Sequence, residues 1–219
     1  MLTVERQVIQ GYSGFSGDLP VPSIADQIET HREFIESNPN EIHTRSTLYV
    51  VVESGNDYIY GGPTVTPELV AKNIYRTSKA LFELPFSAKH FMYANIALDH
   101  LPFSMSLNAT TRDLVRLSRQ KHNRILKTLF RSNTELKAKV FDMNGFLEEE
   151  LSSRRYVNAK NSCIQTSNVL NVIPKICKNP DKKVFWDLFH LTTTAHRRLA
   201  HAIIKDAASL SIGIDSFGY

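Results

Sequence analysis

The sequence predicts an α/β protein of three layers, in which helices cover both faces of a parallel sheet. Short apolar runs alternate along the chain with longer segments of helical periodicity, and that order requires crossover connections between parallel strands. The chain has 219 residues, of which 42% are hydrophobic, and this suits a single globular domain over residues 1–219. Its 9 glycines and 9 prolines are scattered, so no linker or low-complexity tract divides the chain.

Three apolar runs predict the strands of the sheet. TLYVVVE, at residues 47–53, is continuous in β-branched and aromatic residues, which is typical of a strand buried on both faces. HFMYANIAL at 90–98 and AKVFDM at 138–143 predict two further strands. Ligands of such sheets bind beyond the carboxyl ends of the strands. The loops that follow Glu53 and Met143 therefore mark the edge where a site is expected.

Five segments have the periodicity or the start signals of helices. Thr66-Pro67-Glu68, for example, supplies a cap followed by a proline at the first helical position. The predicted helices cover residues 21–36, 66–83, 110–132, 144–156 and 193–209.

Charge and hydropathy argue against several classes of function. The formal net charge is +4, but Lys and Arg are dispersed, which favours a solvated surface over a nucleic-acid interface. No segment is long enough to predict a membrane span, and the start MLTVERQVIQ lacks the apolar core of a secretory signal. A nucleotide-binding domain is disfavoured because no glycine-rich phosphate loop is present.

Asp187 and His190, three residues apart in VFWDLFH, are the first candidates for chemistry. Residues i and i+3 of a turn lie on the same side, so the carboxylate can accept the Nδ1–H of the imidazole. Nε2 is then free to take a proton from a hydroxyl. The same pair also fits the start of a helix, with His190 half-buried beside Trp186. The spacing alone leaves both interpretations open.

Asn56 is the second candidate. It directly follows the first predicted strand and stands beside a glycine, where a turn can aim its amide N–H at an oxyanion. Ser-Gly-Asn-Asp is equally typical of an ordinary turn.

The remaining polar clusters predict neither a metal nor a cofactor. His196 and His201 are five residues apart on a predicted helix and do not share a face, and residues 148–150, all Glu, predict a solvated helix face. Cys163 and Cys177 could be two buried thiols, a disulfide or half a metal site. The last is disfavoured because no further ligand stands nearby at suitable spacing.

Together these segments resemble the GDSL family of serine esterases and lipases, within the SGNH hydrolase superfamily. LYVVVESGNDY is similar to the family block Gly-x-Asn-Asp, and LVRLSRQKHNRILKTL to the helix with its His-Asn pair, here His122-Asn123. CKNPDKKVFWDLFHLTTTAH is similar to the family's ending, Cys-x-Asn-Pro-Asp…Phe-Trp-Asp-x-x-His-Pro-Thr…His. VPSIADQIETHREFI also matches in order, so the resemblance covers nearly the whole chain.

The resemblance implies an ester hydrolase with a Ser-His-Asp mechanism. Asp187 and His190 would activate a serine, and Asn56 would help to form the oxyanion hole. The substrate would be a small-molecule, lipid or acylated-sugar ester, with no nucleic-acid partner and no cofactor. The family's paired cysteines favour a disulfide between Cys163 and Cys177. A secreted parent is also implied, although nothing in this chain directs export.

The chain departs from the family pattern where the nucleophile is expected. It contains no Gly-Asp-Ser; FSGDLP places Ser16 before the Gly-Asp, which makes it a weak nucleophile candidate. Ser54 replaces the first glycine of the Gly-x-Asn-Asp block, and Leu191 replaces the proline after the histidine. We expect a domain that begins inside the family fold, without its first strand, and an impaired or non-catalytic chain. The strand at 47–53 would then lack a neighbour, which predicts poor solubility, dimerisation, or residues 1–20 folding over that edge.

Overall fold

The computed structural model describes residues 11–12, 20–41, 47–53, 55–60, 64–133, 138–164 and 175–210. The chain forms two compact units. The first contains residues 1–96, 118–141 and 210–219, and the second contains residues 97–117 and 142–209. That both belong to one domain stays a prediction.

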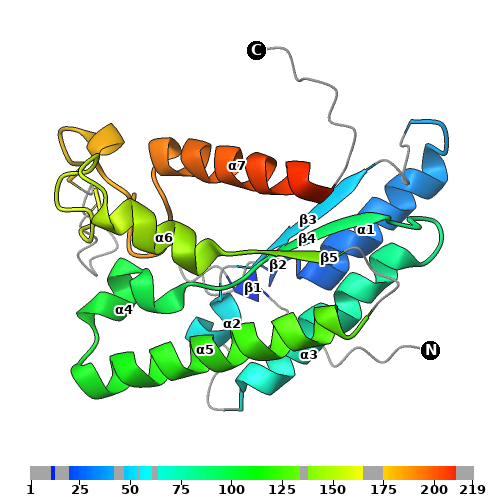
Figure 1. Ribbon diagram of the computed structural model, residues 1–219, viewed down its shortest axis with the longest axis horizontal. Helices are drawn as coiled ribbons and strands as arrows, with labels where there is room; N and C mark the ends of the chain where they lie inside the picture. The colour runs from blue at the N-terminus through cyan, green and yellow to red at the C-terminus, as the bar shows by residue number, and fades with distance from the viewer. Residues whose placement is uncertain are drawn as a thin grey trace. The chain divides into compact units, whose positions relative to one another are not determined.

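A parallel sheet forms the centre of the first unit (Figure 1). Its strands are β3 (Leu48–Val52), β4 (His90–Ala94) and β5 (Ala138–Phe141), in the order β3-β4-β5. Leu48 pairs with His90 and Phe91 pairs with Ala138. Each strand is joined to the next through a helix, and this arrangement confirms the predicted α/β class.

β3 is less buried than its apolar sequence predicts. Val50 is 40% exposed and Val52 is 50% exposed, so the expectation of a strand buried on both faces is wrong. The physical reason is the place of β3 at the end of the sheet. Among the described strands, only β4 pairs with it.

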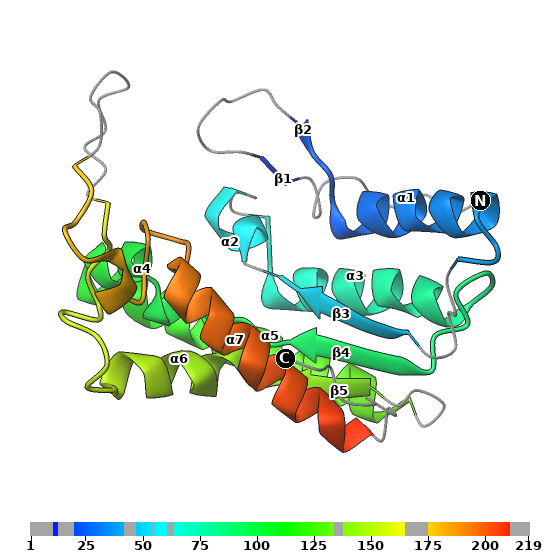
Figure 2. The same cartoon turned by 90° about the horizontal axis from the view of Figure 1, so that it is seen from above.

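Two helices of the first unit begin at side-chain caps, of which the sequence predicts the one at Thr66. Before α1 (Ile24–Ser37), Ser23 Oγ accepts from the N–H of Asp26, and the Asp26 carboxylate accepts from the N–H of Ser23. Before α3 (Pro67–Lys79), the hydroxyl of Thr66 accepts from the N–H of Leu69 at 3.2 Å. Figure 2 shows α1 and α3 side by side, in contact with each other.

An aromatic core holds α5 (Ala109–Arg131) against β4. The ring of Phe130 lies 5.2 Å from that of Phe91 and 5.9 Å from that of Tyr93, measured between centroids. All three side chains are almost fully buried, and Leu126 joins them one turn earlier on the helix. Large buried rings of this kind supply much of the free energy that favours folding.

β4 ends at Ala94, earlier than the run HFMYANIAL predicts, because a side chain takes over the backbone bonding of Ile96. Oδ1 of Asn123 accepts from the N–H of Ile96 at 3.0 Å, and Nδ2 donates to its carbonyl oxygen at 2.9 Å. A residue whose N–H and C=O are both bonded to one amide cannot continue a strand ladder. Asn123 of α5 therefore fixes where the strand ends.

The second unit contains α4 (Pro102–Ser106), α6 (Met143–Ser152) and α7 (Thr193–Ala207). α6 and α7 are in contact. Thr192 caps α7, because its hydroxyl oxygen accepts from the N–H of Ala195 while its O–H donates to the carbonyl of Lys183 at 2.8 Å. This double contact defines where the helix begins.

Short elements complete the described chain. They are the antiparallel pair β1 (Gly11–Tyr12) and β2 (Pro20–Val21), the short helix α2 (Asn56–Tyr60), and the 3₁₀ turns η2 (Ala80–Phe82), η3 (Leu98–His100), η4 (Pro180–Lys182) and η5 (Ala208–Leu210).

Candidate active site

The second unit brings Asp187 and His190 together in one tight turn. Oδ2 of Asp187 lies 2.8 Å from Nδ1 of His190, and Oδ1 lies 3.0 Å from it. The same Oδ1 accepts the backbone N–H groups of Phe189 and His190, each at 2.8 Å. The N–H of Trp186 donates to the carbonyl of His190, which closes the turn. The turn precedes α7, whose first residue is Thr193.

The charge of Asp187 determines how the imidazole is protonated. Partial burial acts to raise the pKa of Asp187, but hydrogen bonds from Phe189 and from the ring and N–H of His190 hold it below its usual value. An ionised carboxylate only accepts hydrogen bonds, so Nδ1 of His190 carries the proton. The His190 side chain is 71% exposed, and its Nε2 has no partner among the residues that the structure describes. This geometry leaves Nε2 as a proton acceptor.

Asn56 belongs to the first unit, where it is the first residue of α2. The preceding Gly55 has φ 83°, a left-handed conformation that favours glycine. Asn56 is exposed, and its side-chain amide makes no hydrogen bond to the described part of the chain. Where the sequence predicts a turn, the structure therefore has Gly55 in a left-handed conformation, followed directly by the short helix α2. Ser16 and Ser54 lie outside the described residues.

A buried polar network lies directly behind this glycine, and the sequence did not predict it. Oε1 of Glu53 accepts from the N–H of Gly55 at 2.8 Å. His122, fully buried on α5, lies 2.7 Å from the hydroxyl of Tyr58 through Nδ1 and 3.0 Å from that of Tyr93 through Nε2. Oε2 of Glu53 has no hydrogen-bond partner among the described residues.

Burial sets the protonation of this network. It raises the pKa of Glu53 to about 8, with a further contribution from Asp57, whose own pKa burial raises to about 6. Burial lowers the pKa of His122 to about 4. Glu53 and His122 are therefore both uncharged near neutral pH. The carboxyl group that accepts the N–H of Gly55, just before Asn56, is thus a neutral one.

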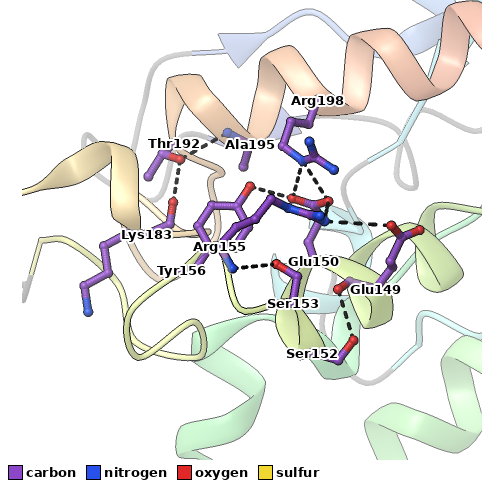
Figure 3. A network of polar contacts seen from close by, with 10 residues as sticks. All are labelled: Glu149, Glu150, Ser152, Ser153, Arg155, Tyr156, Lys183, Thr192, Ala195 and Arg198. Atoms are coloured by element: carbon purple, nitrogen blue, oxygen red, sulfur yellow. Dashed lines mark hydrogen bonds and ion pairs between the residues drawn. The ribbon is translucent and has the colours of Figure 1, made fainter.

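Glu150 shows that the predicted solvated face over residues 148–150 is wrong at one position. Its side chain is 1% exposed, and its carboxylate accepts from Arg198 of α7, from Arg155 and from the hydroxyl of Tyr156 (Figure 3). Burial acts to raise the pKa of Glu150, but these three donors hold it below the usual value. The neighbouring Glu149 stays 73% exposed, as predicted.

A disulfide joins Cys163 and Cys177. The N–H of Cys177 donates to the carbonyl of Cys163, and Ile164 and Ile176 form an antiparallel bridge beside it. The N–H groups of Cys163 and Ile164 donate to the carbonyls of Phe185 and Trp186. The disulfide therefore anchors the strand-like segment that leads into the turn of Asp187 and His190.

The described residues offer neither a metal site nor a membrane span. No three His, Cys, Asp or Glu side chains in them gather as a metal ion would require. None of their helices is both long enough and apolar enough to cross a membrane.

Comparison with known proteins assigns the family. No curated protein matches the chain. The family described as GDSL-like lipase/acylhydrolase matches residues 10–203, a range that contains Asn56, Asp187 and His190. This match, together with the parallel sheet, confirms the resemblance and the fold class expected from the sequence. The chain therefore belongs to the GDSL-like lipase/acylhydrolase family, a family of ester hydrolases.

Proposed function

We propose that Asp187 and His190 are the acid–base pair of a Ser-His-Asp ester hydrolase acting on carboxylic or acetyl esters. The observation that carries this proposal is the contact of 2.8 Å between Oδ2 of Asp187 and Nδ1 of His190, with Nε2 unpartnered in the described chain. Asp187 orients the ring and stabilises the imidazolium that forms during the reaction. Asn56 supplies an amide N–H to the oxyanion.

The reaction then has two halves. A serine oxygen attacks the ester carbonyl while Nε2 of His190 takes the serine proton, and negative charge collects on the former carbonyl oxygen, where the proposed role of Asn56 is to stabilise it. Collapse of this intermediate expels the alcohol, which receives the proton back from His190. In the second half, water attacks the acyl-serine ester while His190 takes its proton. The carboxylic acid is then released and the serine hydroxyl is restored.

We further propose that these 219 residues are impaired as a hydrolase because no Gly-Asp-Ser occurs in them. An incomplete triad retains only the rate supplied by binding and oxyanion stabilisation, roughly 10³- to 10⁴-fold over water. The same absence favours the alternative, a non-catalytic relative that acts by binding. Ser16 is the weak candidate for a substitute nucleophile.

Hydrolysis of p-nitrophenyl acetate by the purified chain tests the proposal, together with labelling by a fluorophosphonate that reacts only with an activated serine. His190→Ala and Ser16→Ala are the informative variants. His201→Ala is the matched control, because His201 is an exposed histidine of α7 outside the candidate site. We expect equal background hydrolysis in all four proteins and no labelled serine.

Other results would revise the proposal in defined ways. Activity and labelling lost in both His190→Ala and Ser16→Ala would establish Ser16 as the nucleophile and overturn the impairment. Loss in His190→Ala alone would indicate another serine or a directly activated water. Substantial activity that survives in His190→Ala would remove His190 from the mechanism.

We also propose that two copies associate through the edge of β3 that no described strand pairs with. Val50 and Val52 are exposed on a strand that pairs, among the described strands, with β4 alone, and such edges pair readily. Sedimentation equilibrium of the wild type and of Val52→Lys measures this. A monomeric wild type would contradict the proposal.

A further inference from the structure

A cavity of about 800 Å³ opens on the second unit, separate from Nε2 of His190. Part of its wall is apolar and comes from α4, α6 and the turn that carries the candidate acid–base pair. These side chains are Pro102, Met105, Leu151 and Leu188. Two cations also line the cavity, Arg112 of α5 and Lys160. A hydrocarbon surface beside fixed positive charge is suited to an amphiphilic anion.

Both cations are unpaired in the part of the chain that the structure describes. Arg112 and Lys160 are exposed, and neither contacts a carboxylate there. By contrast, Arg116, one turn further along α5, pairs with Asp113 at 3.2 Å. An unpaired guanidinium and an unpaired ammonium that line one cavity are free to bind a ligand, and guanidinium is the side chain that best matches a carboxylate.

The other polar groups of the wall are largely occupied by the protein itself. The hydroxyl of Ser106 donates to the carbonyl of Phe103 at 2.6 Å, and that of Ser162 donates to the carbonyl of Ile164 at 2.8 Å. His100 contacts Asn144 at 3.0 Å and Glu148 at 3.3 Å through Nε2.

Two polar groups of the wall remain. Asp99, the acidic member, is engaged in an interaction of its own. Asn161 has a side-chain amide without a partner among the described residues, and this amide is available as a third donor in the same cavity.

The cavity shares a structural element with the candidate active site. Leu188 lines the cavity and stands in sequence between Asp187 and His190. Its carbonyl accepts from the N–H of Phe103 at 3.1 Å, which ties the turn to α4, the helix that carries Met105. A molecule held in the cavity is therefore held against the turn that orients the imidazole.

We infer that this cavity binds a single-chain aliphatic carboxylate. Arg112, Lys160 and Asn161 bind the carboxylate of this ligand. Its alkyl chain contacts the apolar side chains of Met105, Leu151 and Leu188. Such an acid is what hydrolysis of an acyl ester releases. That origin of the ligand rests on the proposed function, whereas the binding itself requires no nucleophile.

Calorimetric titration of the purified protein with octanoate tests the inference. Acetate, which has the carboxylate without the alkyl chain, and 1-octanol, which has the alkyl chain without the carboxylate, are the control ligands. We expect saturable binding of octanoate, much weaker binding of the other two, and an affinity that falls as salt is added. The ¹³C methyl signal of Met105 reports the location. It should shift with octanoate, while that of Met92, which is fully buried in the other unit, should not.

Charge variants then locate the carboxylate. Arg112→Gln and Lys160→Gln should each weaken octanoate binding by up to about fivefold, the range of exposed ion pairs. Arg124→Gln, on the exposed face of the same helix, is the matched control and should bind normally. Ser106→Glu should weaken binding more than Ser106→Gln, because the two side chains are of equal size and differ in charge.

Several outcomes would overturn the inference. No saturable binding would overturn it outright, and so would octanol that binds as tightly as octanoate, since the cations would then contribute nothing. Acetate as tight as octanoate would leave a simple anion site. Ester hydrolysis that survives in His190→Ala would contradict only the proposed catalysis and would leave octanoate binding untouched, so the two failures are distinguishable.

Discussion

Oε2 of Glu53 lies 3.9 Å from Nε2 of His122, and the two side chains are 6% and 0% exposed. At this distance an ion pair would be expected, yet burial raises the pKa of Glu53 to about 8 and lowers that of His122 to about 4. Both groups are therefore uncharged across the neutral range. The stability of the first unit consequently depends on pH through groups that carry no charge near pH 7.

Replacing Glu53 by Gln should remove one part of this pH dependence. The pKa of Glu53 is raised on folding, so its stabilising contribution is complete below the usual value of 4.5 and is lost as pH rises through about 8. Gln keeps the shape and the acceptor for Gly55 but cannot ionise. The melting temperature of Glu53→Gln relative to the wild type should therefore rise between about pH 5 and pH 9. Glu33→Gln, at an exposed position of α1, should show no such trend.

Removal of the Tyr93 hydroxyl should destabilise the protein more than removal of the Tyr58 hydroxyl. Both hydroxyls contact the His122 ring, but Tyr93 is fully buried and Tyr58 only partly so. Tyr93→Phe leaves Nε2 of a buried imidazole without a partner, which costs about 1–3 kcal/mol of unfolding free energy. Water can replace the hydroxyl of Tyr58. Urea unfolding measures both, and an equal loss in the two variants would contradict this account.

Glu150→Gln should lower the stability of the second unit, and Glu149→Gln should not. The carboxylate of Glu150 accepts from both Arg155 and Arg198 at 2.8 Å, whereas that of Glu149 is exposed and lies 3.8 Å from Arg155. Loss of the buried charge should lower the free energy of unfolding by about 2–3 kcal/mol. This is less than for a fully buried ion pair, because both arginines are partly exposed. The pKa of Glu150 is lowered on folding, so its contribution is lost as pH falls. The difference between Glu150→Gln and the wild type should therefore shrink in acid.

Reduction of the disulfide should weaken the segment before the turn of Asp187 and His190. Cys163 and Cys177 are 14 residues apart, and a loop of that size contributes about 3 kcal/mol through the unfolded state. Chemical unfolding with and without reductant measures the difference. The double variant Cys163→Ser and Cys177→Ser should match the reduced wild type and should be insensitive to reductant.

The contact of Asp187 with His190 could be predicted because it is local. Residues i and i+3 of a turn lie on the same side, so their contact depends only on the few residues of the turn. The helix starts at Thr66 and Thr192 are equally local, since each cap bonds to a backbone N–H three residues on. Contacts between residues this close in the chain can be predicted from the sequence alone.

The partners of Glu150 could not be predicted in the same way. Arg198 lies on α7, far along the chain from α6, so only the folded second unit brings the two side chains together. One signal was present. Glu150 follows the buried Leu147 by three residues, which places both on the same face of α6. The exposure of Val52 is a similar case, because it depends on which strand stands beside β3 and not on the strand itself.

The register of the sheet has a consequence for how the chain acquires its structure. Leu48 pairs with His90 and Phe91 with Ala138, so roughly forty or more residues separate each pair along the chain. No two neighbouring strands of this parallel sheet can pair through a tight hairpin, because a long connection that contains a helix must first close into a loop. The chain should therefore be a slow folder whose apolar strands stay open to solvent before they pair, and the yield of refolding should fall as protein concentration rises.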